Sequence, residues 1–134
     1  MYPGLFHRGQ KSRLIGHLVL QPDALKGASE VYIMSVTAEP GDYPDSACEY
    51  ILPESDIVIM TASAAINKTL PGCWSFQKTP VSIIIGPTTP LCPELKALGI
   101  DRLSGMAVRD KVTFEAWATA DHGSPYKHGD VFMI

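Results

Sequence analysis

Four consecutive residues of the sequence, Gly86, Pro87, Thr88 and Thr89, follow a run of apolar residues and precede a predicted helix. The glycine leaves backbone N–H groups open to a ligand, and the threonines add hydroxyl groups. A helix N-terminus carries partial positive charge and binds phosphate, carboxylate or other anions. We therefore predict an anion-binding loop over residues 86–91. The alternative is that Thr88 or Thr89 only caps the helix.

Thr61, Ser63 and Asn67 occupy a similar position after the preceding apolar run. Ser63 is predicted to cap the next helix, which puts Asn67 one turn later at the same end. These side chains are then expected within reach of a ligand in the 86–91 loop. Alternatively, Asn67 hydrogen-bonds a neighbouring loop.

Gly16 and His17 end the first apolar run, and Glu39 follows the second. Dinucleotide-binding folds place an acidic residue after the second strand for a ribose. However, the fingerprint G-x-G-x-x-G is absent after the first run, which argues against a standard nicotinamide cofactor. His17 is a candidate ligand-binding residue, and a packed, hydrogen-bonded histidine is the alternative.

His17, Glu39 and Cys92 are also ligand types for a divalent or heavy metal ion, and we predict them as the metal-binding set. Cys73 is predicted at the opposite edge of the sheet, outside this set. Cys48 is predicted to be buried within a helix as a small apolar residue. The sequence has no closed zinc-site spacing, P-loop, H-E-x-x-H or G-x-S-x-G motif.

The elements that must position these residues alternate between β-rich runs and helix-like stretches. Residues 56–61 and 81–85 are apolar without alternation, which is typical of internal strands covered on both faces. Further strands are predicted at residues 13–17, 30–36 and, more weakly, 103–108. The pattern predicts an α/β fold: a Rossmann-like, open, mostly parallel sheet of five or six strands with helices on both faces. Ligands of such sheets bind outside the carboxyl ends of the strands.

Leucine spacing predicts a helix over residues 91–98 that Gly99 caps. A second helix is predicted over residues 62–70, stopped by Pro71 and Gly72. Three stretches are shorter or ambiguous: residues 48–52 form a short helix, residues 112–119 fit one helix, and residues 131–134 fit an edge strand.

Length and composition predict one domain over residues 1–134, with 46% hydrophobic and 19% charged residues. A net charge of −3 gives no basic surface, so nucleic acid is not expected as a partner. The apolar runs are far shorter than the ~20 residues of a membrane span, and no secretory signal is visible. Three cysteines without a C-x-x-C pair fit free thiols in a reducing cytosol, so we expect a cytoplasmic protein without internal disulfides.

Several of these segments together resemble one protein family, described as "putative heavy-metal chelation" (domain of unknown function 364). Its specific part is Gly-Pro-Thr-Thr-Pro-Leu at residues 86–91, with Asp-Ile-Val-Ile-x-Thr at residues 56–61 and Asn67. The resemblance extends over roughly residues 12–110. Weaker agreements are Gly16-His17, Glu39-Pro40-Gly41-Asp42, Leu52-Pro53, Gly99-Ile100 and Gly105.

The resemblance implies a Rossmann-like carboxyl-terminal domain, which in that family follows a domain like the small domain of enolases. It implies a site between the two domains, lined here by His17, Glu39, Thr61, Asn67, Thr88 and Thr89. We expect the amino-terminal domain to be absent from this chain. A homodimer, or a separate chain that supplies that domain, is expected to cover the exposed face.

Three classes of function remain. The first, which we favour, is a domain that binds a small molecule, an anion or a metal ion, in heavy-metal handling or chelation. The second is an enzyme that acts on a nucleotide-like or phosphorylated substrate held by the 86–91 loop. The third is a structural or interaction domain without an active site.

Overall fold

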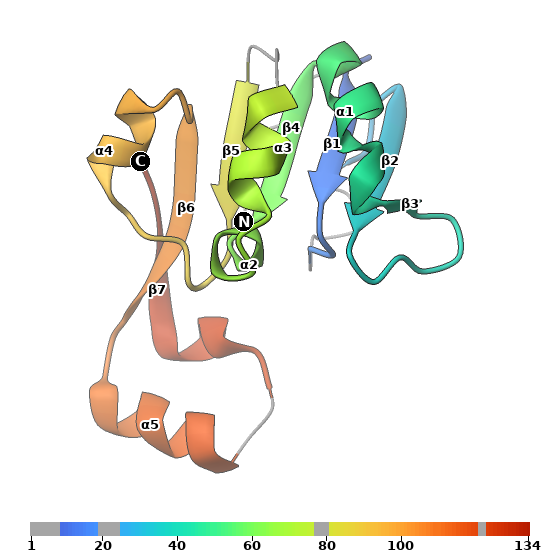
Figure 1. Cartoon of the computed structure of the whole chain (residues 1–134). Coiled ribbons are helices and arrows are strands. Elements are labelled where there is room, and N and C mark those ends of the chain that lie inside the picture. The colour runs from blue at the N-terminus through green and yellow to red at the C-terminus, as the bar shows by residue number, and fades with distance from the viewer. Residues whose placement is uncertain (1–8, 19–24, 77–80, 121–122) are drawn as a thin grey trace.

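Seven strands of the chain form one open sheet (Figure 1). The computed structural model describes residues 9–18, 25–76, 81–120 and 123–134. The strands are β1 (Lys11–Ile15), β2 (Glu30–Ser35), β3 (Tyr43–Pro44), β4 (Ile57–Thr61), β5 (Val81–Ile85), β6 (Arg102–Val108) and β7 (Gly129–Met133). The α-helices are α1 (Cys48–Ile51), α2 (Ser63–Ile66), α3 (Leu70–Phe76), α4 (Pro93–Ala97) and α5 (Lys111–Ala120). Short 3-10 helices are η1 (Asp45–Ala47), η2 (Leu52–Glu54) and η3 (Pro125–His128).

The strand order is β3-β2-β1-β4-β5-β6-β7, and every pair is parallel except β6 with β7. This order confirms the α/β fold and the internal places of β4 and β5. The sheet has seven strands where five or six were predicted. The additional strand is β3, which has two residues and pairs Tyr43 with Met34 and Pro44 with Ser35. A strand this short leaves no periodic pattern in a sequence.

The central strands are apolar on both faces because both faces are covered. Val58 and Met60 of β4 belong to the core cluster that also contains residues of α1 and α3. Ile57 and Ile59 face the other way, against Ile83 and Ile85 of β5. All four of these isoleucines are at most 3% exposed.

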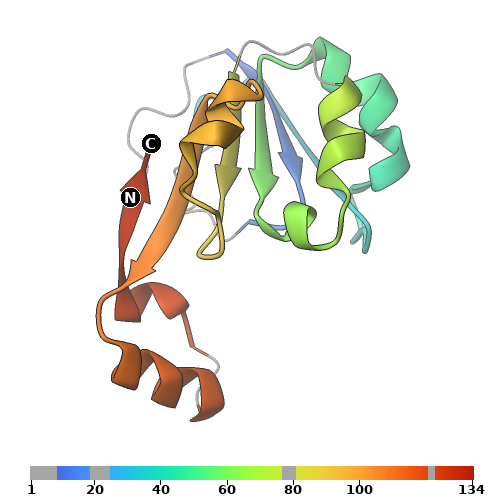
Figure 2. The same cartoon turned by 60° about the vertical axis from the view of Figure 1, so that its left-hand side comes forward.

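Three of the helices lie on one face of the sheet. Cys48 of α1, Trp74 of α3 and Leu95 of α4 all contact the larger core cluster, and the arrangement is visible in Figure 2. Against the opposite face, Leu18 and Val81 pack among the described residues. Helices were predicted on both faces, and residues 19–24, in the link between β1 and β2, lie outside the described residues.

The helix predicted over residues 62–70 is broken in two, which corrects the sequence-based prediction. Lys68 has φ of +64°, the left-handed region that ends a helix, and α3 starts at Leu70. Pro71 therefore lies in the first turn of α3, where proline is tolerated because its missing N–H needs no partner. The expected stop at Pro71 and Gly72 was wrong for this reason. By contrast, Gly99 follows α4 with φ of +100°, as predicted.

The segment after β6 leaves the sheet and returns to it. The helix α5 lies beyond the carboxyl end of β6 in both views (Figures 1 and 2), and none of its residues is buried. Its Trp117 ring lies 5.7 Å from the His128 ring. The chain then comes back as β7, the predicted edge strand. No helix in the described ranges has the length and apolar character needed to cross a membrane.

Candidate functional site

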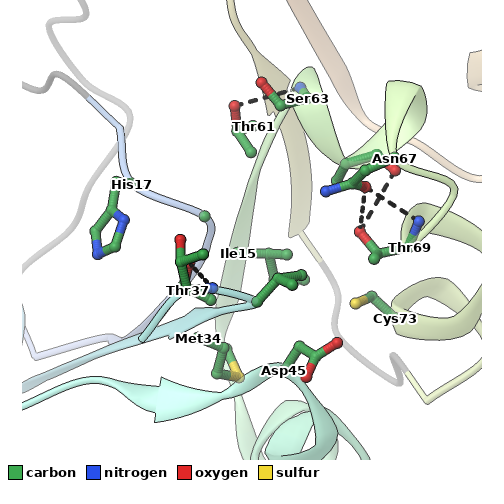
Figure 3. A pocket seen from close by; sticks show the side chains of 14 residues that line it. Ile15, His17, Met34, Thr37, Asp45, Thr61, Ser63, Asn67, Thr69 and Cys73 are labelled. Carbon is green, nitrogen blue, oxygen red and sulfur yellow. Dashed lines mark hydrogen bonds between the residues drawn. The ribbon is translucent and has the colours of Figure 1, made fainter. Parts of the chain in front are cut away.

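A cavity of about 200 Å³ opens at the carboxyl ends of β1, β2 and β4 (Figure 3). The strand order reverses between β1 and β4, which is where open α/β sheets bind their ligands. Its walls come from Ile15, Gly16, His17, Met34, Ser35, Val36, Thr37, Asp45, Thr61, Ser63, Ala64, Asn67, Thr69 and Cys73. Of the residues predicted to bind a ligand, the structure brings Gly16, His17, Thr61, Ser63 and Asn67 together here.

Gly16 shapes the cavity because the chain turns there. Its φ is +82°, and a Cβ on it would lie 2.4 Å from Thr61 Cγ2. The turn ends β1 at Ile15, two residues before the predicted end, and it directs His17 to the cavity rim.

His17 is 41% exposed and has one strong partner. Its Nε2 lies 2.6 Å from Oδ2 of Asp42, and the same oxygen accepts the Glu39 backbone N–H at 2.9 Å. Hydrogen bonds from Glu39 and His17 hold the pKa of Asp42 below its ordinary value. His17 is thus oriented by a carboxylate, while its exposed ring edge is open to a ligand.

The polar wall of the cavity is built around the break between α2 and α3. Asn67 Oδ1 accepts hydrogen bonds from the Thr69 backbone N–H at 3.2 Å and from Thr69 Oγ1 at 2.8 Å. The amide NH₂ of Asn67 is therefore the group left for a ligand (Figure 3). Ser63 does not cap α2, since the N-cap is Ala62 and Ser63 N–H donates to Thr61 Oγ1 at 3.4 Å. Asn67 thus hydrogen-bonds the adjacent loop at Thr69, and its role in ligand binding stays a prediction.

Sulfur atoms form another part of the cavity. Cys73 and Met34 line it, and Cys48 lies behind them with its Sγ 3.5 Å from Cys73 Sγ and 3.7 Å from Met34 Sδ. The neighbouring Cys73 and burial raise the pKa of the Cys48 thiol. Cys73 was predicted at the opposite edge of the sheet, and this is wrong because α3 starts afresh after Lys68 and packs against α1. The burial predicted for Cys48 is confirmed.

The 86–91 loop packs closely against β6. The helix α4 begins at Pro93 with Cys92 as its N-cap. Thr88 and Thr89 were predicted at the N-terminus of this helix, and that prediction is wrong. The loop instead lies on β6, where a Cβ on Gly105 would come within 2.6 Å of the Thr89 carbonyl oxygen. Thr88 is exposed, whereas Thr89 is 5% exposed and its buried hydroxyl has no hydrogen-bond partner.

Comparison with known proteins agrees with this architecture. The family model described as "Putative heavy-metal chelation" (DUF364) matches residues 6–128. The chain belongs to the DUF364 family. No functionally curated protein matches its sequence.

Two solved structures of DUF364 proteins are similar to the chain. One is from Desulfitobacterium hafniense DCB-2, with 32% identity and a TM-score of 0.84 over 95% of this chain and 53% of that one. The other is from Pyrococcus horikoshii, with 24% identity and a TM-score of 0.80 over 93% of this chain and 54% of that one. Both are described as proteins of unknown function. This chain spans about half the length of either.

The metal ligands predicted for this DUF364 chain are not brought together. Cys92 Sγ hydrogen-bonds Glu94, Glu39 is exposed outside the cavity, and His17 pairs with Asp42. Within the described ranges, no three side chains of His, Cys, Asp and Glu lie close enough to share an ion. The sulfur atoms of Met34, Cys48 and Cys73 are the donor set that fits a heavy metal, because thiolate and thioether ligands prefer soft ions.

The polar or sulfur-containing residues of this DUF364 site that sequence reasoning missed include Asp42, Asp45, Thr69 and Cys73. Thr69 follows Asn67 by two residues, a spacing common in side-chain turns, so it carried a usable local signal. Asp42, Asp45 and Cys73 reach the site only through the packing of loops and helices that are distant in sequence.

Proposed function

We propose that this domain binds a small polar ligand or a metal ion in the cavity over β1, β2 and β4, as part of heavy-metal handling. The observation that supports it is the hollow at the reversal of strand order. Hydroxyl, amide and imidazole groups line this hollow together with sulfur and carboxylate groups (Figure 3). Convergent polar groups in such a crevice are typical of binding sites.

The size of the cavity limits the ligand. Sites for drug-sized ligands occupy about 300–1,000 Å³, whereas this cavity holds about 200 Å³. An ion, a small carboxylate or the end of a larger molecule is the chemistry that fits. A longer ligand would need a second wall, which a partner chain can supply.

Thermal unfolding with a panel of Zn²⁺, Cd²⁺, phosphate and citrate tests the proposal. A ligand at 100 times its Kd adds about 2.7 kcal/mol to the free energy of unfolding. His17→Ala should weaken binding at the cavity by about tenfold or more. His128→Ala is the matched control, because His128 lies beside Trp117 in the α5 segment. Equal effects of the two substitutions on the binding of Zn²⁺, phosphate and citrate, or no ligand in the panel, would contradict the proposal.

The second candidate function is anion binding by the 86–91 loop. In an enzyme, this loop would hold the phosphate group of the substrate. The support for this candidate is the buried Thr89 hydroxyl without a partner, because such a group usually costs stability unless something binds it. Replacing Thr88 and Thr89 together by valine should weaken sulfate or phosphate binding at least about tenfold. Unchanged phosphate binding by a folded double variant would exclude this candidate.

The proposal includes a reducing cytoplasmic location, which keeps the three thiols free, and a homodimer. Phe132, Met133 and Ile134 are exposed at the edge strand β7, and such apolar residues on an open edge favour association. Light scattering at tens of micromolar should return twice the 14.5 kDa chain mass. The mass of a single chain would contradict the dimer.

A further inference from the structure

Three sulfur atoms from three separate elements meet beside the cavity. Met34 comes from β2, Cys48 from α1 and Cys73 from α3. All three side chains are at most 6% exposed. Sγ of Cys48 is the centre of the group, with the other two sulfurs 3.5 and 3.7 Å away.

These separations suit a shared metal ion. With bonds of about 2.3 Å, the zinc–sulfur length, two sulfur ligands on a tetrahedral ion lie about 3.8 Å apart, and a larger ion such as Cd²⁺ needs a spacing a few tenths of an ångström wider. Both measured separations are within a few tenths of an ångström of this value. Two thiols and a thioether are soft donors, which select soft ions over Mg²⁺, Ca²⁺ or Mn²⁺.

The sulfur group can be reached from outside. Met34 and Cys73 line the main cavity, while Cys48 and Cys73 line a second hollow that also shares Asp45 and Thr69 with the first. Asp45 borders both hollows, and Figure 3 shows it near Met34 and Cys73. A carboxylate at the entrance attracts cations and offers an oxygen ligand.

We infer that Cys48, Cys73 and Met34 form a binding site for a soft divalent cation of the Cd²⁺ or Hg²⁺ class. The inference rests on the proposed metal-binding function and names the class of ion and its ligands. On binding, each thiol loses its proton to solvent, and the two thiolate charges neutralise the divalent ion. Neutrality favours a divalent ion here, because a net charge in a buried site is costly.

Titration of the reduced, oxygen-free protein with Cd²⁺ tests the inference. We expect one ion per chain and a thiolate-to-metal absorption band. Calorimetry in two buffers of different ionisation enthalpy should give about two protons released. Cys48→Ala and Cys73→Ala should each lower the affinity roughly 100-fold and remove the band, and Met34→Leu should lower it roughly tenfold. Cys92→Ala is the matched control and should change little, since Cys92 lies outside this group.

Protection from alkylation gives a test that needs no variant. Bound Cd²⁺ should shield Cys48 and Cys73 of the wild-type protein from iodoacetamide, while Cys92 continues to react. The inference is overturned if Cys92 alone is shielded, if folded alanine variants keep the band, or if Cd²⁺ does not bind. If Cd²⁺ fails while phosphate or Zn²⁺ binds in a His17-dependent manner, the proposed function survives without this site. If no ligand binds, both fail.

Discussion

Two neighbouring regions lie at the carboxyl edge of the sheet, where open α/β sheets bind their ligands, and they differ in how closely they are packed. After β1 and β4 the chain encloses a hollow lined by polar groups, whereas after β5 the 86–91 loop is packed. The difference comes from the neighbours of each loop. Gly16 and the break at Lys68 open space above β1 and β4, while Gly105 lets the 86–91 loop settle directly onto β6. We therefore expect a loop at a strand end to bind a ligand more readily where its neighbours leave it uncovered, and anion binding by the 86–91 loop stays a prediction.

We expect the largest change in stability from a substitution at the cavity, at Gly16. Gly16→Ala brings a Cβ to 2.4 Å from Thr61 Cγ2 at a φ of +82°. Overpacking and left-handed strain each cost about 1–3 kcal/mol, so we expect a loss of about 2–6 kcal/mol in the free energy of unfolding, measured in urea.

Two controls isolate the clash at Gly16. Gly41→Ala, at φ +102° with no atom within 4 Å, should cost only the backbone strain of about 1–3 kcal/mol. Thr61→Ser removes Cγ2, and the nearest remaining Thr61 atom is Cβ at 3.3 Å. The double variant Gly16→Ala with Thr61→Ser should therefore recover part of the loss. No recovery would contradict the clash as the cause.

We expect the second largest change in stability from a substitution beneath the 86–91 loop, at Gly105. Gly105→Ala sets a Cβ 2.6 Å from the Thr89 carbonyl oxygen, a backbone atom that moves only with its loop. We expect a loss of about 1–3 kcal/mol in unfolding free energy. Gly72→Ala in α3, where no atom lies within 4 Å, is the control and should be neutral or stabilise by up to about 1 kcal/mol. A neutral Gly105→Ala would mean that the 86–91 loop lifts easily and is open to a ligand after all.

Substitutions of Thr69 in the cavity wall and Thr89 in the packed loop should change the free energy of unfolding in different directions. Thr69 donates to Asn67 at 2.8 Å in the cavity wall, so Thr69→Val should cost about 1 kcal/mol. The Thr89 hydroxyl is buried without a partner, so Thr89→Val should be neutral or stabilising by about 1 kcal/mol. Thermal unfolding of both variants measures this. A destabilised Thr89→Val would show that its hydroxyl has a partner, such as bound water or an anion.

The smallest effect is a pH dependence at the cavity rim. The pKa of Asp42 is lowered by hydrogen bonds from Glu39 and His17. Its contribution to stability is therefore fully present above the unfolded pKa of about 3.9 and is lost as pH falls through the lower folded value. Asp42→Asn should be less stable than wild type at pH 6, with the difference shrinking below about pH 4. A difference that does not change over this range would contradict the assigned cause.

Local pattern in the sequence determined the strands and their parallel arrangement. The unbroken apolar runs of β4 and β5 require cover on both faces, and the structure places both strands inside the sheet. The position of Gly99 after α4 was equally predictable, because a left-handed backbone conformation at a helix end strongly favours glycine. Such features depend on a few adjacent residues, so the sequence alone displays them.

Only the tertiary structure decided which side chains share a site. Cys48 and Cys73 are 25 residues apart, and they meet because one left-handed residue, Lys68, ends α2 and lets α3 start in a new direction against α1. A continuous helix would have carried Cys73 away, as the sequence pattern predicted. The closure of the 86–91 loop likewise depends on Gly105, 16 residues beyond Thr89. Contacts between distant segments depend on packing geometry. Hydrophobic periodicity describes each segment separately and does not predict those contacts.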